Sequence, residues 1–307
     1  MSDLATFNAH RTHLLNLAYR MLGEMAAAED VVQEAWVRWH TADAGDIHNP
    51  RAWLSAATVR LSLDALRKVR ARRETYVGPW LPEPILPDDM RAFAADGPAE
   101  KAELASELSL ALLHVLERLA PEERAAFILH DAFDCEYAEI AAVLGKSETA
   151  CRQLVSRARG RLKSDRPRFA ASKEAHRDLL LRFAQAAAAP DPQAVMALLA
   201  PDAIAYSDGG GRMPAALKPI YGADKIARFL TGLRRKFYAN AALDAQLVEV
   251  NGEPGLVLRA DGAFLGLVTI ETDGQQIGAV YILRNPEKLS RFIRAFDDHE
   301  SSASVSA

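Results

Sequence analysis

The residues best suited to a chemical role lie on the second of two short helices predicted between Tyr137 and Leu162. Apolar residues recur there every three or four positions, and this spacing places the remaining residues on the outward face of a helix. Arginine can donate two hydrogen bonds to guanine, glutamine can pair with adenine, and serine or threonine can bind a phosphate or a base edge. These types predict a DNA-binding surface made of Ser147, Thr149, Arg152, Gln153, Ser156 and Arg157.

Two residues between these helices predict how they are joined. Gly145 follows the apolar face of the first helix, Tyr137 to Leu144, and glycine permits the left-handed turn of a helix-turn-helix. Ser147 can cap the second helix, Glu148 to Leu162. The core side of that helix consists of Cys151, Leu154, Val155, Ala158 and Leu162. The alternative reading is an ordinary helical hairpin with a solvated basic face.

The first 73 residues predict further helices. Residues 4–39 carry apolar residues at helical spacing with a break at Gly23, and another helix begins after Asn49, which can cap it, and runs to about Arg73. Trp36 and Trp53 fall on apolar faces and are expected in the core. Polar groups on these helices are Glu29, Asp30, Gln33 and Glu34 on the first segment, and Arg60, Asp64, Arg67, Lys68 and Arg70 on the second.

The segment from Tyr76 to Pro98 contains five prolines and therefore predicts an extended linker rather than a helix. Helices are predicted again over residues 100–119 and 121–132. Within the linker, residues 80–84 read Trp-Leu-Pro-Glu-Pro, a stiff apolar stretch that costs little entropy to dock on another surface.

The pattern changes after Lys163. Helices are predicted over 173–188, 193–199 and 223–237, followed by strands over 243–250, 255–259, 263–271 and 276–283. Helices followed by a meandering sheet indicate an α+β domain. Asp202 or Asp208 could act as a general base in a pocket of such a domain, but the strands offer no clear acid–base pair, so binding is favoured over catalysis.

Composition limits the class of protein. The 307 residues, half of them apolar, are enough for two or three domains, and the net charge of −4 says little because basic residues are clustered. No stretch predicts a membrane span or a signal peptide, so the expected location is the cytoplasm. Cys135 and Cys151 are expected to be small buried residues, and no spacing predicts a zinc site or a cofactor.

Three N-terminal motifs in order resemble region 2 of extracytoplasmic-function sigma factors. They are residues 28–36 (Ala-Glu-Asp-Val-Val-Gln-Glu-Ala-Trp), 49–54 (Asn-Pro-Arg-Ala-Trp-Leu) and 64–67 (Asp-Ala-Leu-Arg). Residues 152–159, Arg-Gln-Leu-Val-Ser-Arg-Ala-Arg, are similar to region 4 of the same family. The chain departs from the family at Leu154, where many members carry a basic residue.

The resemblance implies binding to core RNA polymerase and to promoter DNA. It implies that Glu29, Asp30, Gln33 and Glu34 face the polymerase. The predicted helix-turn-helix would read the −35 element. The −10 element would be held by region 2, with a flipped base in the loop 41–48 and Asn49, Arg60, Asp64, Arg67, Lys68 and Arg70 nearby.

The C-terminal part resembles a SnoaL-type domain, a cone-shaped α+β fold that encloses an apolar pocket, for which a small apolar ligand is a candidate partner. Residues 208–212 (Asp-Gly-Gly-Gly-Arg), 285–289 (Asn-Pro-Glu-Lys-Leu) and the 80–84 segment resemble the sigma-factor group that carries this extension. We expect a regulatory interdomain contact between Trp80, Leu81, Pro82, Glu83 and Pro84 and the residues Asp208, Gly209, Gly210, Gly211 and Arg212. The alternative is a passive linker.

The predicted organisation is therefore two all-α sigma domains followed by an α+β domain. The boundaries are 1–75 for region 2, 76–105 for the linker, 106–168 for region 4, 172–298 for the SnoaL-like domain and 299–307 for a tail. The chain is expected to be a sigma factor regulated in cis by its C-terminal domain, and not an enzyme. The competing hypothesis is a DNA-binding regulator whose C-terminal domain is a working enzyme.

Overall fold

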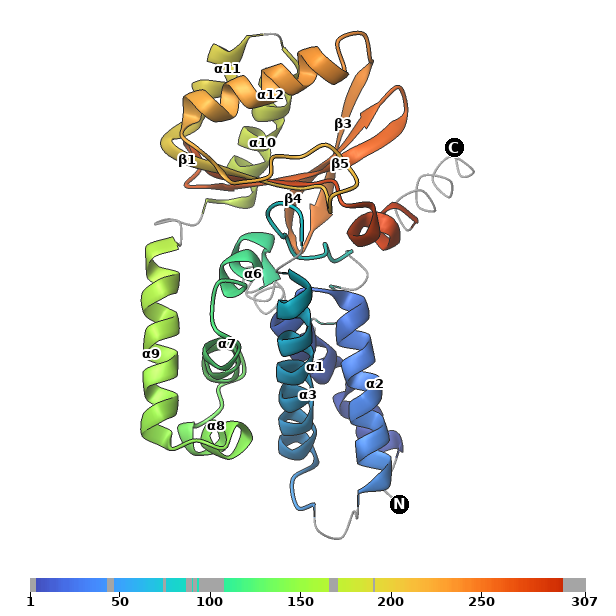
Figure 1. The fold of residues 1–307 in the computed structure, drawn as a ribbon, viewed down its shortest axis with the longest axis vertical. Coiled ribbons are helices and arrows are strands. Elements are labelled where there is room, and N and C mark those ends of the chain that lie inside the picture. Colours follow the sequence, from blue (N-terminus) through green and yellow to red (C-terminus); the bar gives the residue numbers. More distant parts are fainter. Residues whose placement is uncertain are drawn as a thin grey trace. The chain divides into compact units, whose positions relative to one another are not determined.

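The computed structural model describes residues 4–42, 47–73, 76–86, 90, 93, 108–165, 171–189 and 191–294, with the backbone alone for 69–73 and 163–165 (Figure 1). Loop residues 43–46, the Arg70 side chain, most of the predicted linker beyond residue 86 and the tail 299–307 lie outside the described residues. The chain forms two compact units. The first consists of residues 1–75, 91–108 and 112–166, and the second of 76–90, 109–111 and 167–307.

The first unit begins with three helices, α1 (Leu4–Leu22), α2 (Met25–Thr41) and α3 (Pro50–Arg73). Gly23 separates α1 from α2 with a φ of +70°, which confirms the predicted break. Asn49 caps α3 as predicted, because its Oδ1 accepts a hydrogen bond from the Ala52 N–H at 3.1 Å.

The remaining helices of this part of the chain are α6 (Leu110–Leu116), α7 (Pro121–Phe127), the π-helical turn η2 (Ile128–Ala132), α8 (Tyr137–Leu144) and α9 (Glu148–Asp165). The predicted helix over 121–132 thus ends in a π turn instead of a continuous α-helix. On α7, the buried Arg124 donates to the Met21 carbonyl at 2.7 Å and to Glu117 Oε1 at 2.6 Å. This contact joins the two helical groups of the first unit.

The second unit packs three helices against one face of a six-stranded sheet (Figure 1). The helices are α10 (Lys173–Ala188), α11 (Pro192–Met196) and α12 (Ala223–Phe237). The strands are β1 (Leu199–Asp208), β2 (Ile220–Tyr221), β3 (Leu243–Val250), β4 (Glu253–Ala260), β5 (Ala263–Thr272) and β6 (Ile277–Leu283). Their order is β2-β1-β6-β5-β4-β3, and this mixture of helices and sheet is the predicted α+β class.

Several expectations for individual elements were wrong. Residue 199 begins β1 instead of ending a helix, and β1 pairs in parallel with β6, so the sheet is more than a meander. Trp36 and Trp53 are only half-buried, whereas Trp39, 3% exposed, takes the core position on α2. Cys151 is buried as expected, but Cys135 is half-buried.

The sheet buries apolar residues on both faces. One cluster lies between the sheet and α10 to α12 and includes Leu180, Phe183 and Ile226. The other contains Val257 and Leu267 from the sheet together with Leu289 and Phe292 from the helix at 286–294, and it also contains Leu81. A residue of the predicted linker therefore belongs to the hydrophobic core of the second unit.

Glu253 at the start of β4 makes the stability of the second unit depend on pH. Burial and the nearby Glu271 carboxylate raise its pKa to about 7, against the opposing effect of Lys173. The folded chain therefore binds this proton more tightly than the unfolded chain, and stability is lost as the pH rises from about 4.5 to about 7.

Replacement of Glu253 by Gln is expected to raise the free energy of unfolding at pH 8, by on the order of 2–3 kcal/mol, because no buried carboxylate then has to ionise. Near pH 4 the change should be small. Urea unfolding of the full chain at both pH values measures it, and Glu249→Gln, an exposed neighbour on β3, is the control. An equal shift at both pH values would contradict this explanation.

Candidate functional site

The outward face of α9 carries the polar residues singled out from the sequence. Thr149, Arg152, Gln153, Ser156 and Arg157 are all exposed, and Ser147 before them is also exposed. Ser147 Oγ accepts a hydrogen bond from the Ala150 N–H at 3.2 Å, so the predicted cap is present. The opposite face, Cys151, Leu154, Val155, Ala158 and Leu162, is buried. A single helix thus presents polar side chains at a spacing suited to a DNA groove.

The turn before α9 has the predicted conformation. Gly145 lies in the left-handed region with a φ of +64° and a ψ of +38°, which a residue with a Cβ adopts only with strain. The structure also explains the departure from the family at Leu154, because this side chain is only 5% exposed. Leucine at this position serves the core of the helix pair and not the polar face.

The cationic residues of α9 are partly neutralised by neighbouring acids. Arg152 lies 3.1 Å from Glu148 and stacks over the Tyr137 ring, with 4.3 Å from its guanidinium carbon to the ring centroid. Arg157 pairs with Glu123 on α7 at 3.2 Å. The pair of Arg152 with Glu148 is exposed on both sides, and pairs of this kind contribute only about 0–1 kcal/mol. A phosphate can therefore displace Glu148 from Arg152 at little cost, whereas the Glu123 partner of Arg157 is buried.

The α2 residues predicted to face the polymerase lie on one side of the helix. Asp30, Gln33 and Glu34 are exposed, and Glu29 is half-buried. Glu34 pairs with Arg38 one turn later, at 3.3 Å and with both side chains about half exposed. This face is accessible, polar and mostly acidic.

The predicted DNA-backbone residues of α3 have unequal surroundings. Arg60 donates to the carbonyls of Ala142 and Val143, both at 3.1 Å, so its guanidinium meets the C-terminal end of α8. Asp64 and Arg67 pair with each other at 2.8 Å, and Lys68 is exposed. The Nε and Nη2 donors of Arg60 are therefore engaged within the protein.

A second site lies within the second unit, around Asp208 at the end of β1. This carboxylate is fully buried and receives four hydrogen bonds. The donors are the Tyr76 hydroxyl at 2.5 Å, the Leu81 N–H at 2.9 Å, the Gly210 N–H at 3.0 Å and Lys288 Nζ at 2.7 Å. Two of these donors belong to the predicted linker, so one aspartate fixes residues 76 and 81 on the C-terminal domain.

Lys288 completes this contact. Its ammonium group, 6% exposed, donates to the Leu81 carbonyl at 2.5 Å and lies 3.9 Å from the centroid of the Trp80 ring. The Asn285 side-chain amide donates to the Tyr76 hydroxyl at 2.9 Å. Further along, Asn251 Oδ1 accepts from the Ile85 N–H at 2.9 Å. The linker segment, defined as residues 76–86, is therefore held at both ends.

The glycines after Asp208 are required by close packing. A Cβ on Gly209 would lie 2.2 Å from the Met213 carbonyl oxygen, and one on Gly210 would lie 2.5 Å from Asn285 Cγ. Gly211 has a φ of +72° and faces Val77, and Arg212 pairs with Glu287 at 2.5 Å on the surface. The tight turn lets Asp208 and Asn285 approach Tyr76 together.

No individual role was predicted from the sequence for four residues of this site, namely Tyr76, Asn251, Asn285 and Lys288. Asn285 and Lys288 lie within the 285–289 motif, which therefore held the missing signal. Tyr76 and Asn251 stand in no motif, and only the tertiary structure brings them to the segment.

No helix in the described part of the chain is long and apolar enough to span a bilayer. Within the same residues, no cluster of three or more His, Cys, Asp and Glu side chains is suited to hold a metal ion.

Comparison with known proteins identifies two sigma-70 segments in the chain. Residues 6–73 match the family model "Sigma-70 region 2", and residues 109–162 match "Sigma-70, region 4". The chain is 39% identical to the ECF RNA polymerase sigma factor SigJ of Mycobacterium tuberculosis over 94% of its own length and 93% of that protein. It is 32% identical to a probable ECF sigma factor, SigI, of the same species, over 93% and 94%.

Similarity extends to a solved structure over nearly the whole chain, the C-terminal α+β domain included. The crystal structure of M. tuberculosis SigJ aligns with 94% of this chain and 98% of that chain, with a TM-score of 0.71 and 37% identity. The chain belongs to the extracytoplasmic-function family of RNA polymerase sigma factors, which direct transcription initiation from specific promoters.

Proposed function

We propose that this sigma factor is regulated in cis through the linker segment 76–86 bound to its C-terminal domain. The observation that carries the proposal is the buried Asp208 carboxylate, which binds Tyr76 and Leu81 together with Lys288. A passive linker would not need a buried ion pair, since burying two charges is costly unless their geometry is good.

The contact can affect promoter binding because of the position of the linker segment in the chain. It lies between α3, which ends the proposed region 2, and α6, near the start of the proposed region 4. A free chain samples many end-to-end distances, whereas a chain fixed along residues 76–86 samples far fewer. Holding the segment therefore limits the separations that the two promoter-reading domains can adopt.

We assign each exposed polar face of the sigma helices to one binding partner. We assign recognition of the −35 element to the outward face of α9, and binding of core polymerase to the α2 face around Asp30 and Glu34. We assign the −10 element to Asn49, which caps α3, and to the α3 residues Arg60, Asp64, Arg67, Lys68 and Arg70.

The enzyme alternative for the C-terminal domain gains no support from the two aspartates considered for it. Asp202 is exposed on β1, and Asp208 is occupied by the linker segment. Neither residue lines the apolar cavity of this domain.

Transcription from a promoter selected in a genomic library, with purified core polymerase, tests the proposed regulation. Two changed proteins, a chain ending after Asp165 and the full chain with Trp80→Ala, should both alter promoter output in the same direction. The first removes the domain that binds the segment, and the second removes the ring that packs on Lys288. The control for the loss of an aromatic side chain is Tyr221→Ala, because Tyr221 is exposed in the C-terminal domain. Trp39 is unsuitable for this purpose because it is buried in the first unit. Unchanged output from both test proteins would refute regulation through the segment, whereas no initiation by any form would contradict the sigma assignment itself.

A further inference from the structure

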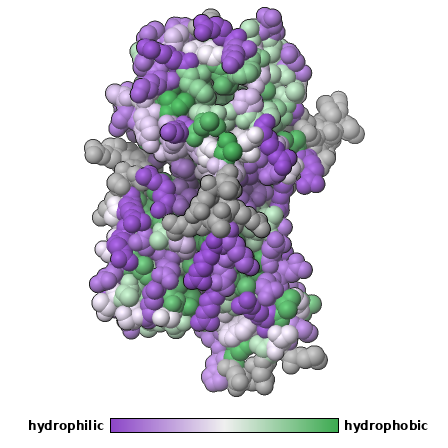
Figure 2. All heavy atoms as spheres, viewed as in Figure 1, coloured by the Kyte–Doolittle hydropathy of each residue, from purple (hydrophilic) through white to green (hydrophobic). Residues whose placement is uncertain are grey.

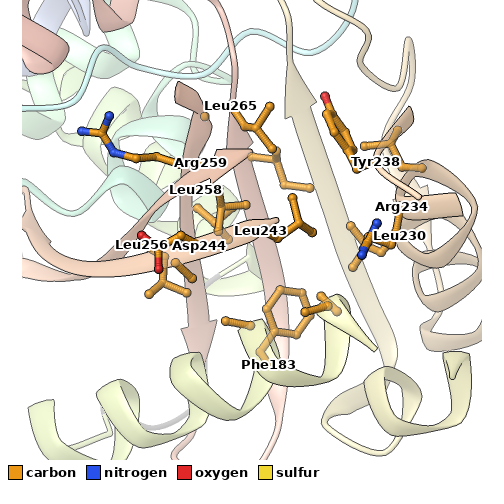
Figure 3. Close-up of a pocket in the computed structure, with 18 of the residues that line it drawn as sticks. Phe183, Leu230, Arg234, Tyr238, Leu243, Asp244, Leu256, Leu258, Arg259 and Leu265 are labelled. Atoms are coloured by element: carbon orange, nitrogen blue, oxygen red, sulfur yellow. The ribbon is translucent and has the colours of Figure 1, made fainter. Parts of the chain in front are cut away.

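The C-terminal domain contains a partly open apolar cavity that the sigma function does not use. It has a volume of about 160 Å³ and lies between α10, α12 and the sheet (Figure 3). Its walls are mostly apolar, with Phe183 from α10, Leu230 from α12, and Leu256, Leu258 and Leu265 from the strands. Figure 2 shows hydrophobic residues gathered in the middle of the visible face of this domain, with hydrophilic residues around them.

One cationic side chain of this cavity has unmet hydrogen-bonding capacity. Arg234, on the last turn of α12, lines the cavity, and its Nε and Nη1 atoms are buried with no hydrogen-bond partner among the described residues. Buried guanidinium N–H groups are normally paired, because leaving them without an acceptor costs the full desolvation penalty. The Nε and Nη1 groups of Arg234 are therefore two donors that can bind an acceptor in the cavity.

The surrounding polar groups do not supply that acceptor. Arg284, a second buried guanidinium of the wall, donates to neutral oxygens among the described residues, namely the carbonyls of Leu265 and Pro214 and the Tyr238 hydroxyl. The acid of the lining, Asp244, is exposed on β3, and Figure 3 shows Asp244 and Arg259 on the side of the cavity opposite Arg234 and Tyr238. The Arg234 side of the cavity thus favours a negative charge.

We propose that this cavity binds a small monocarboxylate with an apolar body, and that Arg234 donates hydrogen bonds to its carboxylate. The volume is close to that of an apolar cavity of about 150 Å³ that accepts benzene. A phenyl ring or a short branched chain therefore fits the apolar walls. Phosphate esters and sugars do not, because the walls offer few partners for their additional oxygens. The proposal stands independently of the regulatory role of the linker segment.

Calorimetric titration of the full chain with phenylacetate, and with the uncharged phenylacetamide of almost equal size, tests the proposal. Phenylacetate should bind at least about tenfold more tightly than the amide, because a hydrogen bond to a charged group is stronger than one to a neutral group. Arg234→Gln should remove this preference. Arg182→Gln, an exposed arginine on α10 outside the cavity, should retain it.

Arg234→Lys separates anion binding from a structural effect of the substitution. It keeps the charge but not the fork of donors, so phenylacetate should remain preferred with a weaker affinity. Equal binding of acid and amide to the natural chain, no binding of the acid, or full affinity in Arg234→Gln would each overturn the proposal. Should Arg234→Gln fail to fold, the comparison of acid with amide in the natural chain and in Arg234→Lys decides.

Discussion

Replacement of Asp208 by Asn is expected to release residues 76–86 from the C-terminal domain. All four groups that bind this carboxylate are donors, and an asparagine offers them one oxygen while directing an NH₂ group at the others. The substitution also takes the negative charge away from the Lys288 ammonium, which is 6% exposed. Breaking a buried ion pair by removing one partner costs about 3–5 kcal/mol.

Hydrogen exchange of the full chain measures this release. The Leu81 and Ile85 amides, which donate to Asp208 and Asn251, should exchange about a hundredfold or more faster in Asp208→Asn, because each 1.4 kcal/mol is about a factor of ten. Asp224→Asn is the matched control, since its pair with Arg228 is 2.9 Å long but exposed and worth about 0–1 kcal/mol. Unaltered protection of the segment in Asp208→Asn would show that Asp208 does not hold it.

Replacement of both Arg152 and Gln153 by Ala is expected to abolish most promoter-specific binding of the holoenzyme. Each base-reading contact of these types is worth about 1–3 kcal/mol, so loss of two should weaken binding by about a hundredfold or more. The fold should tolerate the change, because both side chains are exposed and the pair of Arg152 with Glu148 lies on the surface. The expected defect is therefore in recognition and not in stability.

Two measurements distinguish this result from a general loss of activity. Affinity for the isolated core polymerase should not change, and the affinity of the holoenzyme for DNA lacking the upstream element should fall only slightly. Arg182→Ala, which removes an exposed arginine from α10, serves as a charge-matched control. If core binding fell together with promoter binding, the roles assigned to α9 and α2 would be wrong.

Local signals in the sequence were sufficient for the helix-turn-helix. Gly145 and Ser147 act on their own neighbours through backbone conformation and capping, so their roles can be predicted without the rest of the fold. Strands β3 to β6 can also be predicted from local signals, because short turns join consecutive antiparallel neighbours. The parallel pairing of β1 with β6 joins residues about 75 positions apart, and no local pattern encodes it.

Interactions of charged side chains were less predictable than the helices that carry them. Arg60 is a suitable phosphate ligand by type, yet it binds the carbonyls of Ala142 and Val143. The periodicity of α3 places Arg60 outside, but it cannot tell which helix end will lie against it. In the same way, the pKa of Glu253 is raised because the fold buries its carboxyl group and, to a smaller extent, brings the Glu271 carboxylate close to it.

The sequence by itself determined that α9 carries a polar face suited to DNA, because helical periodicity alone separates that face from the core. It also determined that residues 80–84 form a stiff apolar stretch suited to docking, since proline restricts the backbone locally. Only the tertiary structure decided what that stretch binds. The fold brings together five residues from four distant places in the chain, namely Tyr76, Asp208, Asn251, Asn285 and Lys288. A buried carboxylate and a buried ammonium are stable only when they pair with each other and when neutral groups complete their hydrogen bonds.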